Sequence, residues 1–300
     1  MTMTQQATAA GTGTPAVPMT AEQRAAFDRD GYLMIRGALG PDEVAAAREA
    51  LDRVYAARAE AGALGPGGSM HLLSAVANCP ELAGLTDHPA TFSHVWSVLG
   101  WNAHIYHSHL DVHPPVREPM PFRFEWHQDG GRQNREIETT PRPRLSVKLA
   151  YWLSDVSEPG RGNLKIVPGS HLANRIDGPP RRDIEWPDPD GAAEVTARPG
   201  DALFFDRRIW HTRSRNYSPH TRKAVFFGYT YRWTAIRDDI GPMRASDWFA
   251  RLTPVQQQLL GGADDLGGDH AWGHDPATTP LHGWLNERGL LDPANPPLRP

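Results

Sequence analysis

Two side chains of metal-binding type stand two residues apart in the run His127-Gln128-Asp129. In an extended strand successive side chains alternate between faces, so His127 and Asp129 would point the same way. A third donor, His211, follows far downstream at the end of an apolar segment. Two imidazoles and one carboxylate leave open positions on a metal, and this ligand set is typical of non-haem Fe(II) oxygenases. We therefore predict a metal centre formed by His127, Asp129 and His211.

The surroundings of the pair favour a site over a chance occurrence. An aromatic run, residues 122–126, precedes His127, and two glycines follow Asp129, as at the mouth of a strand. A His-x-Asp pair alone is common by chance, and a lone histidine near aromatic residues is often a hydrogen-bonded core residue. It is the combination of the pair, its setting and the distant histidine that indicates a metal.

An arginine extends this constellation. Arg222 follows His211 after a turn-rich segment, residues 216–219. A hairpin about that turn would place His211 and Arg222 opposite each other on neighbouring strands, with Cβ atoms about 5 Å apart. The guanidinium would project beside the metal and could take a carboxylate in a bidentate fork. A solvent-facing arginine is the alternative, and the small apolar face that Arg222 shares with Ala224 and Phe226 disfavours it.

The combined motif resembles the phytanoyl-CoA dioxygenase family of Fe(II)/2-oxoglutarate-dependent oxygenases. The resemblance covers about residues 24–235 and rests on Trp126-His-Gln-Asp129, Val167-Pro-Gly-Ser-His171, Gly200-Asp-Ala-Leu-Phe-Phe205 before His211, and Arg222. It implies a double-stranded β-helix in which His127, Asp129 and His211 bind iron and Arg222 holds the distant carboxylate of 2-oxoglutarate.

The same resemblance implies the activity. Fe(II), 2-oxoglutarate as cosubstrate, and O₂ would together oxidise an unactivated C–H bond of a small molecule, with a polar or secondary-metabolite substrate expected. Halogenating relatives lack the carboxylate ligand, so the presence of Asp129 favours hydroxylation. Desaturation and cyclisation use the same chemistry and stay open.

Two positions depart from the family pattern. Members often carry a lysine in the strand before the His-x-Asp pair, where this chain has His113 ahead of two prolines. Many have a small hydroxyl residue two positions past the distal histidine, where this chain has Arg213. His113 is therefore a candidate contact of the cosubstrate, and Arg213 is a candidate contact of the substrate.

Four further residues are candidates for binding a ligand. The alternation in residues 145–153 places Lys148 and Trp152 together on the face opposite an apolar one, toward the pocket. Lys148 could meet an anionic group of the cosubstrate or be solvated, and the two readings are equally open. Arg132 and Gln133 directly follow the metal pair and could bind a polar substrate or form a solvated loop.

Histidines are also concentrated elsewhere. His104, His107 and His109 are expected on one face of a strand, where a second metal site and hydrogen-bonded structural histidines are both compatible with the sequence. The structural role is the commoner one. His171 belongs to a Pro-Gly-Ser-His turn, which also favours a structural role.

Three regions are expected to position these residues. Residues 20–100 are mainly helical, with a capping box at Thr20, and residues 101–235 carry short β-branched and aromatic segments between Pro/Gly turns. This pattern predicts a mainly β fold with flanking helices and a jelly-roll or cupin-like core. Residues 236–300 form a mixed C-terminal extension. The predicted strands are 32–36, 103–112, 122–129, 144–153, 163–167, 194–197, 202–206, 209–214 and 223–231, and the predicted helices are 20–29, 42–61, 89–99, 248–260 and 280–288.

Two segments carry no regular pattern. Residues 1–19 are rich in Thr, Ala, Gly and Gln with almost no charge, which predicts a disordered tail. Residues 172–192 hold many Pro, Arg and Asp, which predicts a long loop and a candidate lid over the site.

Composition limits the classes of function. A chain of 300 residues that is 39% hydrophobic can bury one sizeable core, and we expect one oxygenase domain over residues 20–300. The net charge of −4 disfavours a nucleic-acid partner. No apolar run reaches the roughly 18 residues of a membrane span, and a single cysteine, Cys79, fits a cytoplasmic protein. We expect a small-molecule substrate and a monomer or homodimer.

Two other classes stay open. A non-catalytic small-molecule-binding module on the same β-helix would keep the fold without turnover. A cupin-type metal enzyme would act without 2-oxoglutarate and usually offers more histidine ligands. A Gly-rich phosphate loop before a helix and a Gly-x-Ser-x-Gly elbow are both absent, which disfavours nucleotide-phosphate and serine-hydrolase chemistry.

Overall fold

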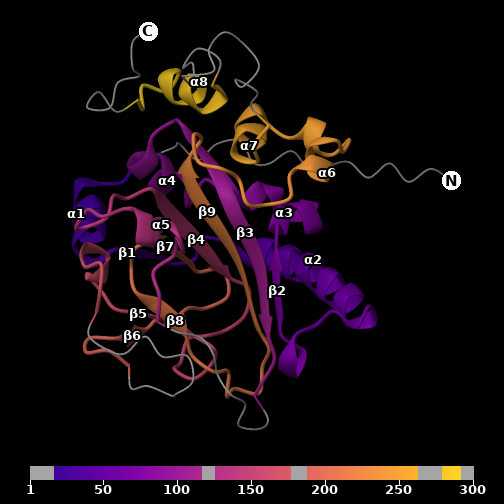
Figure 1. Ribbon diagram of the computed structural model, residues 1–300. Coiled ribbons are helices and arrows are strands. Elements are labelled where there is room, and N and C mark those ends of the chain that lie inside the picture. The colour runs from indigo at the N-terminus through magenta and orange to yellow at the C-terminus, as the bar shows by residue number, and fades with distance from the viewer. Residues whose placement is uncertain (1–16, 117–125, 177–187, 263–278, 292–300) are drawn as a thin grey trace, which may run out of the picture.

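Two antiparallel sheets form the body of the protein. The computed structural model describes residues 17–116, 126–176, 188–262 and 279–291. Within them, a six-stranded sheet has the order β1-β7-β4-β9-β3-β2 and a three-stranded sheet has the order β6-β5-β8. Figure 1 shows β4, β9 and β3 side by side in the larger sheet, with the smaller sheet at the lower left. The strands are β1 (Tyr32–Ile35), β2 (Met70–Leu73), β3 (Ala103–His113), β4 (Ser146–Trp152), β5 (Leu164–Ile166), β6 (Ala193–Glu194), β7 (Ala202–Asp206), β8 (His211–Arg213) and β9 (Arg222–Tyr231).

Helices gather mainly before and after the β segments in the chain. The first begins at a capping box, in which Thr20 Oγ1 accepts from the Gln23 amide and the Gln23 side chain accepts from the Thr20 amide, and it ends at Gly31, whose φ is 81°. The α-helices are α1 (Ala21–Asp30), α2 (Pro41–Glu60), α3 (Ala75–Asn78), α4 (Phe92–Leu99), α5 (Gln133–Glu136), α6 (Gly241–Arg244), α7 (Pro254–Leu259) and α8 (Pro280–Asn286), and the 3₁₀ turns are η1 (Pro66–Gly68), η2 (Pro80–Leu85), η3 (Ser170–Leu172) and η4 (Phe249–Arg251).

The larger sheet separates two apolar cores. On one face, Val147, Leu149 and Tyr151 of β4 pack in a cluster that includes Phe92 and other helix residues. On the other face, Ala150 and Trp152 of the same strand belong to a cluster with Phe205 of β7 and Phe226 of β9. The predicted alternation of this strand is therefore confirmed. We call the second face the inner face, because its cluster also includes Leu164 and Ile166 of the smaller sheet.

Most predicted elements are confirmed, with shifts at their ends. The strand predicted at 194–197 is wrong, because β6 covers only Ala193–Glu194, and the following chain contributes a single bridge from Ala197 to Val156. The helix predicted at 248–260 is interrupted, because Thr253 caps a new helix that has Pro254 in its first turn. The elements β2, α3, α5, α6, η1, η2 and η3 were not predicted.

Some predictions fall partly outside the described residues. Of the strand predicted at 122–129, the structure describes only Trp126–Asp129, where one bridge joins His127 to His211. The tail predicted at 1–19 is described only from residue 17, and the loop predicted at 172–192 is described on either side of residues 177–187.

A bulge in β3 determines which of its histidines share a face. The register with β9 shifts between Ile105 and His107, so that His104 lies opposite Thr230 and His107 lies opposite Gly228. In a regular strand without a bulge, positions three apart, such as 104 and 107, point to opposite faces. The bulge therefore places both histidines on the inner face, as expected. A Cβ at Gly228 would lie 2.8 Å from Tyr106 Cε1, so this position requires glycine.

The predicted hairpin between His211 and Arg222 is wrong. Strand β8 pairs with β5, where His211 lies opposite Ile166, and β9 pairs with β3, where Arg222 lies opposite His113. The turn after β8 therefore carries the chain from one sheet to the other. The side chain of Asn216 fixes this crossing, because its amide donates to the carbonyl of His113 at 2.9 Å.

Among the described residues, no helix combines the length and the apolar character that a bilayer span requires.

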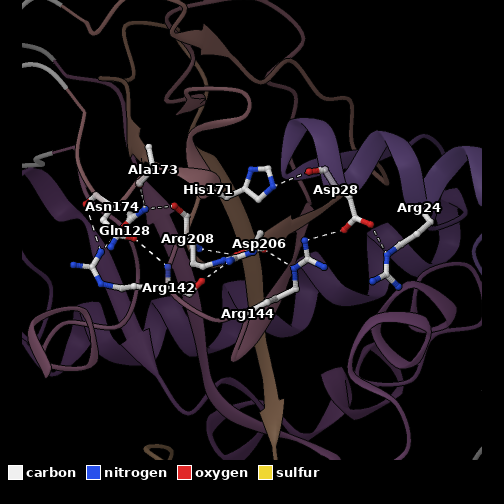
Figure 2. Close-up of polar contacts among 10 residues, drawn as sticks. All are labelled: Arg24, Asp28, Gln128, Arg142, Arg144, His171, Ala173, Asn174, Asp206 and Arg208. Atoms are coloured by element: carbon white, nitrogen blue, oxygen red, sulfur yellow. Dashed lines mark hydrogen bonds and ion pairs between the residues drawn. The ribbon is translucent and has the colours of Figure 1, made fainter. Parts of the chain in front are cut away.

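A chain of ion pairs ties β7 to the helical region and to the segment before β4. Asp206, fully buried at the end of β7, accepts from Arg208 and from Arg144, each at 2.7 Å. Arg144 also pairs with Asp28 of α1 at 2.9 Å. Figure 2 shows these side chains in one row. Burial would raise the pKa of Asp206, but its bonds to Arg208 and the charges of both arginines outweigh burial and lower it.

We expect Asp206→Asn to lower the free energy of unfolding by about 3 kcal/mol at pH 7, since it leaves buried arginine charges without their partner. The lowered pKa means that ionised Asp206 contributes its full stability above the unfolded value of about 3.9, and the contribution is lost as the pH falls through the folded pKa. The difference in free energy of unfolding between the wild type and the Asp206→Asn variant should therefore be smaller at pH 3 than at pH 7. Urea unfolding at both pH values measures it. Equal stability at pH 7 would contradict the role given to this carboxylate.

Candidate metal centre

The structure brings His127, Asp129 and His211 together. One ligand atom of each lies within 4.8 Å of the others. His127 Nε2 is 4.0 Å from Asp129 Oδ1, and His211 Nε2 is 3.6 Å from Asp129 Oδ2. His211 is buried, whereas the His127 side chain is 46% exposed. One metal ion can therefore be held between a buried ligand, His211, and a half-exposed ligand, His127.

Backbone pairing creates this proximity. The amide of His127 donates to the carbonyl of His211, and the amide of His211 donates back, each at 3.0 Å. This reciprocal pair sets the two imidazole centroids 4.4 Å apart. The Asp129 amide donates in turn to the carbonyl of Arg207 at 3.0 Å. The segment that carries the His-x-Asp pair is thus hydrogen-bonded at two places, to Arg207 ahead of β8 and to His211 at the start of β8.

The charges in the group suit a cation. His211 Nδ1 lies 2.8 Å from the carbonyl of Ile209, so Nδ1 carries the proton and the Nε2 lone pair faces Asp129. Burial lowers the pKa of His211 to about 4, which keeps the ring neutral at pH 7. Burial would raise the pKa of Asp129, but Lys148 and the two histidines outweigh it and hold that pKa well below its usual range. A lone pair facing a carboxylate is repulsive unless a cation lies between them, so these residues fit a divalent metal.

Lys148 lies in the same group. Its ammonium is buried and 2.7 Å from Asp129 Oδ2. Burial disfavours the charge of Lys148, but the Asp129 carboxylate outweighs burial and raises its pKa. Lys148 lies in the interior, on the face that the alternation of β4 predicted. The sequence suggested the cosubstrate or solvent as its partner, and in this structure its ionic partner is Asp129. The ammonium engages Asp129 Oδ2, whereas Asp129 Oδ1 faces His127 Nε2 at 4.0 Å.

Gln128, between the two ligands, points away from them and anchors the segment. Its amide nitrogen donates to the carbonyls of Ala173 and Arg208, and its oxygen accepts from Arg142 at 3.1 Å. Figure 2 shows this side chain reaching both the η3 segment and the ion-pair row. Because adjacent side chains of an extended segment point in opposite directions, fixing Gln128 also fixes the direction of His127 and Asp129.

Arg222 lies on the inner face but does not stand beside His211 across a hairpin. It is 2% exposed, its Nη1 is 3.3 Å from Asp111 Oδ2, and its guanidinium carbon lies 5.8 Å from the Phe226 ring centroid. His113, the opposite residue on β3, has its Nε2 3.6 Å from the same Asp111 oxygen. The residues proposed to contact the cosubstrate, Arg222 and His113, thus converge on one carboxylate.

The candidate substrate residues are scattered. Trp152 is fully buried in the inner core, and Arg213 is the last residue of β8, on the same strand as His211. Arg132 is 87% exposed and pairs with Glu136, and Gln133 begins the short helix α5. The structure therefore buries Trp152, leaves Arg213 partly buried, and places Arg132 on the surface.

A second group of potential ligands lies along β3. His71 Nδ1 is 2.7 Å from Asp111 Oδ1, and His109 joins them to form a trio whose ligand atoms lie within 4.8 Å. His109 Nδ1 is 3.1 Å from His107 Nε2. Sequence reasoning missed this group because it did not predict β2, which carries His71. The alternation of His107, His109, Asp111 and His113 along one strand was the available signal.

Comparisons with known proteins agree with this geometry. The model of the phytanoyl-CoA dioxygenase (PhyH) family matches residues 27–224. The ectoine dioxygenase of Sphingopyxis alaskensis is 24% identical over 258 residues, which cover 77% of this chain and 82% of that protein. The ectoine dioxygenase of Streptomyces avermitilis is 26% identical over 275 residues, which cover 81% and 91%.

Solved structures share the fold. The non-haem α-ketoglutarate-dependent carbocyclase SnoK from nogalamycin biosynthesis superposes with a TM-score of 0.57 and 25% identity, covering 81% of this chain and 94% of that one. HygX from Streptomyces hygroscopicus, with nickel and 2-oxoglutarate bound, has a TM-score of 0.58 and 21% identity, covering 73% and 90%. These likenesses confirm the predicted jelly-roll core with flanking helices.

We expect Gln128→Ala to weaken Mn(II) binding about tenfold, because loss of the anchor lets both ligand side chains reorient. Isothermal titration calorimetry with the full chain measures this effect. Gln257→Ala is the matched control, since its amide also donates to backbone carbonyls, those of Phe249 and Leu252, far from the ligands in the chain. Equal metal affinity of both variants would show that Gln128 does not position the site.

Proposed function

The chain belongs to the phytanoyl-CoA dioxygenase family, and we propose that His127, Asp129 and His211 hold the Fe(II) of an enzyme that oxidises a small molecule with 2-oxoglutarate and O₂. The chain is an iron- and 2-oxoglutarate-dependent oxygenase by its relatives and its structural neighbours. The observation that supports the residue assignment is that two imidazoles and one carboxylate, carried by two separate segments of the chain, converge at one place.

Bound iron, with 2-oxoglutarate and O₂, supplies the oxidising power that a C–H bond requires. The protein's own residues orient the reactants. His211 is fixed in one tautomer by the carbonyl of Ile209, and Lys148 holds one oxygen of Asp129. Arg222, which is buried, would hold the far carboxylate of the cosubstrate through its guanidinium. The apolar inner core around Trp152 excludes water from this end of the site.

The substrate proposed is a compact polar molecule or a secondary-metabolite intermediate, and the proposed reaction is hydroxylation of an unactivated C–H bond. Curated relatives act on ectoine by name, and HygX has been solved with hygromycin B. We propose that both substrate types be tested, since residues of the opening such as His127 are polar and exposed.

Three further features belong to the proposal. Residues 20–300 act as one oxygenase domain, because core residues from Phe27 to Leu285 belong to one cluster. The protein works in the cytoplasm, which is consistent with its single buried thiol, Cys79. It acts as a monomer or homodimer.

The test is succinate production by the full chain, with and without Fe(II) and with 2-oxoglutarate omitted, against ectoine and a panel of polar metabolites. We expect His127→Ala and Asp129→Ala to abolish turnover and Fe(II) binding while circular dichroism stays unchanged. Full activity in both variants would refute the assignment. Ligand binding without succinate would indicate a non-catalytic module, and turnover without 2-oxoglutarate would indicate a cupin-type enzyme.

We expect Arg222→Ala to raise the apparent KM for 2-oxoglutarate by about 10- to 100-fold, the equivalent of one charge-assisted interaction of roughly 1.5–3 kcal/mol. The KM for the organic substrate should change much less, because Arg222 is proposed to contact the cosubstrate and not the organic substrate. Steady-state kinetics with each reactant varied in turn separates the two effects. An unchanged KM for the cosubstrate would reject this role.

A further inference from the structure

Arg207 is a buried arginine that has no carboxylate partner in the described part of the chain. It is 1% exposed, and a guanidinium keeps its positive charge even in the interior of a protein. The two carboxylates within electrostatic reach, Asp206 and Asp129, are bonded to other cations. Asp206 Oδ2 accepts from Arg208 at 2.7 Å, and Asp129 Oδ2 lies 2.7 Å from the Lys148 ammonium. Because desolvation of an unpaired charge is costly, the charge of Arg207 is available to a ligand.

The Arg207 guanidinium has one occupied corner and one open edge. Nη1 donates to the carbonyl of Asp129 at 2.8 Å and to the side-chain oxygen of Asn134 at 3.2 Å. Nε and Nη2 are buried and have no hydrogen-bond acceptor among the described residues. These two nitrogens form the side edge of the planar fork, where two N–H groups point in parallel. The open edge therefore has the geometry that binds both oxygens of a carboxylate.

Glycine at position 130 lets the guanidinium lie against the segment of the metal ligands. A Cβ at Gly130, whose φ is 119°, would stand 2.1 Å from Arg207 Nη1. Any larger residue would push the guanidinium away from this segment. Gly130 directly follows Asp129, one of the proposed iron ligands. The guanidinium is thus held next to the metal centre.

The surroundings of Arg207 belong to the inner face. A Cβ at Gly228 would lie 2.8 Å from Tyr106 Cε1, so the Tyr106 ring lies over Gly228, which pairs with Lys148 of β4. Burial lowers the pKa of Arg207, and the Tyr106 hydroxyl is the first group that opposes burial. Burial also acts against the charge of Lys148, and after Asp129 the same hydroxyl helps to raise the pKa of that lysine. Arg207, Tyr106 and Lys148 therefore surround one polar region of the inner face.

A second buried donor lies beside Arg207. Ser146, the first residue of β4, shares the inner face with Lys148, and its carbonyl accepts from the Arg207 amide at 3.4 Å. Ser146 is 3% exposed, and its hydroxyl has no hydrogen-bond partner among the described residues. Buried polar groups without partners cost free energy that a bound oxygen acceptor would recover. The hydroxyl and the guanidinium edge together indicate a ligand with carboxylate oxygens.

We propose that Arg207 binds a carboxylate of the organic substrate through Nε and Nη2, with the Ser146 hydroxyl as an additional donor. The inference rests on the proposed function, because it assigns this subsite to the compound that is oxidised at the metal. It names an organic acid, rather than a neutral compound, as the class of substrate.

This subsite is separate from the one proposed for the cosubstrate. Arg222 begins β9, and Gly228 lies six residues further along the same strand, about 20 Å away. Two arginines of the interior therefore bind two different carboxylates, one of the cosubstrate and one of the substrate.

Acetate and acetamide test the subsite as a charged and an uncharged probe of the same size. The full chain is loaded with Mn(II) and 2-oxoglutarate, so that the cosubstrate occupies Arg222, and the relaxation of the probe's methyl protons by Mn(II) is measured by NMR. We expect the wild type to relax acetate about tenfold more than acetamide, as one charge-assisted interaction implies. Arg207→Gln should relax both probes equally. Arg135→Gln, which removes an exposed arginine of α5, is the matched control and should retain the acetate effect.

Two results would overturn the inference. One is equal relaxation of acetate and acetamide by the wild type. The other is an acetate effect that persists in Arg207→Gln, because the probe would then bind the metal itself or another group. If circular dichroism shows that Arg207→Gln does not fold, Arg207→Lys replaces it, since lysine keeps the charge and lacks the planar edge. That variant should bind acetate several-fold more weakly, and unchanged binding would again overturn the inference. Absence of any relaxation of 2-oxoglutarate protons by Mn(II) would instead count against the proposed function.

Discussion

The reciprocal backbone hydrogen bonds between His127 and His211 are the constraint on which the rest of the site depends. They join the described residues Trp126–Asp129 to the short strand β8 through one bridge, and they set the two imidazoles side by side. Contacts made by neighbouring residues support this pair of hydrogen bonds. Gln128 anchors one side, and the ion pairs of Asp206 hold β7 just ahead of β8 in the chain. The positions of the donors are thus determined by the backbone, and the side chains need little freedom to reach a metal.

The inner face combines an apolar lining with paired charges. Trp152, Phe205 and Phe226 provide the lining, while Lys148 pairs with Asp129 and Arg222 pairs with Asp111. Charges buried in such surroundings persist only when they are paired, because desolvation is costly. Each pair combines a residue of a central strand with a carboxylate that a ligand or metal can approach. The interior therefore combines an apolar lining with two ion pairs at defined positions. Selective binding of a small anion requires such a combination.

Local patterns in the sequence were sufficient to predict much of this arrangement. The capping box at Thr20, the alternation in β4 and the ends of β7 depend on neighbouring residues, and the structure agrees with them. The partner of Arg222 could not be predicted, because nothing local indicates that the chain leaves one sheet for the other after β8. His71 escaped notice for a similar reason. Its strand is four residues long, and its contact with Asp111 exists only through pairing with β3. Proximity of the metal donors was easier to predict, since two of them stand two residues apart in the sequence and the third follows an apolar strand.

The bulge at Tyr106 determines where strand β3 can change its length. Substitutions along β3 change one side chain at a time, whereas an insertion or deletion outside the bulge changes the parity of the strand. Loss of Tyr106 itself would leave a regular strand in which His104 and His107 stand two positions apart and still share the inner face, with Ile105 still directed to the helix-covered core. A one-residue deletion in β3 therefore preserves both faces of the strand when it removes the bulge residue.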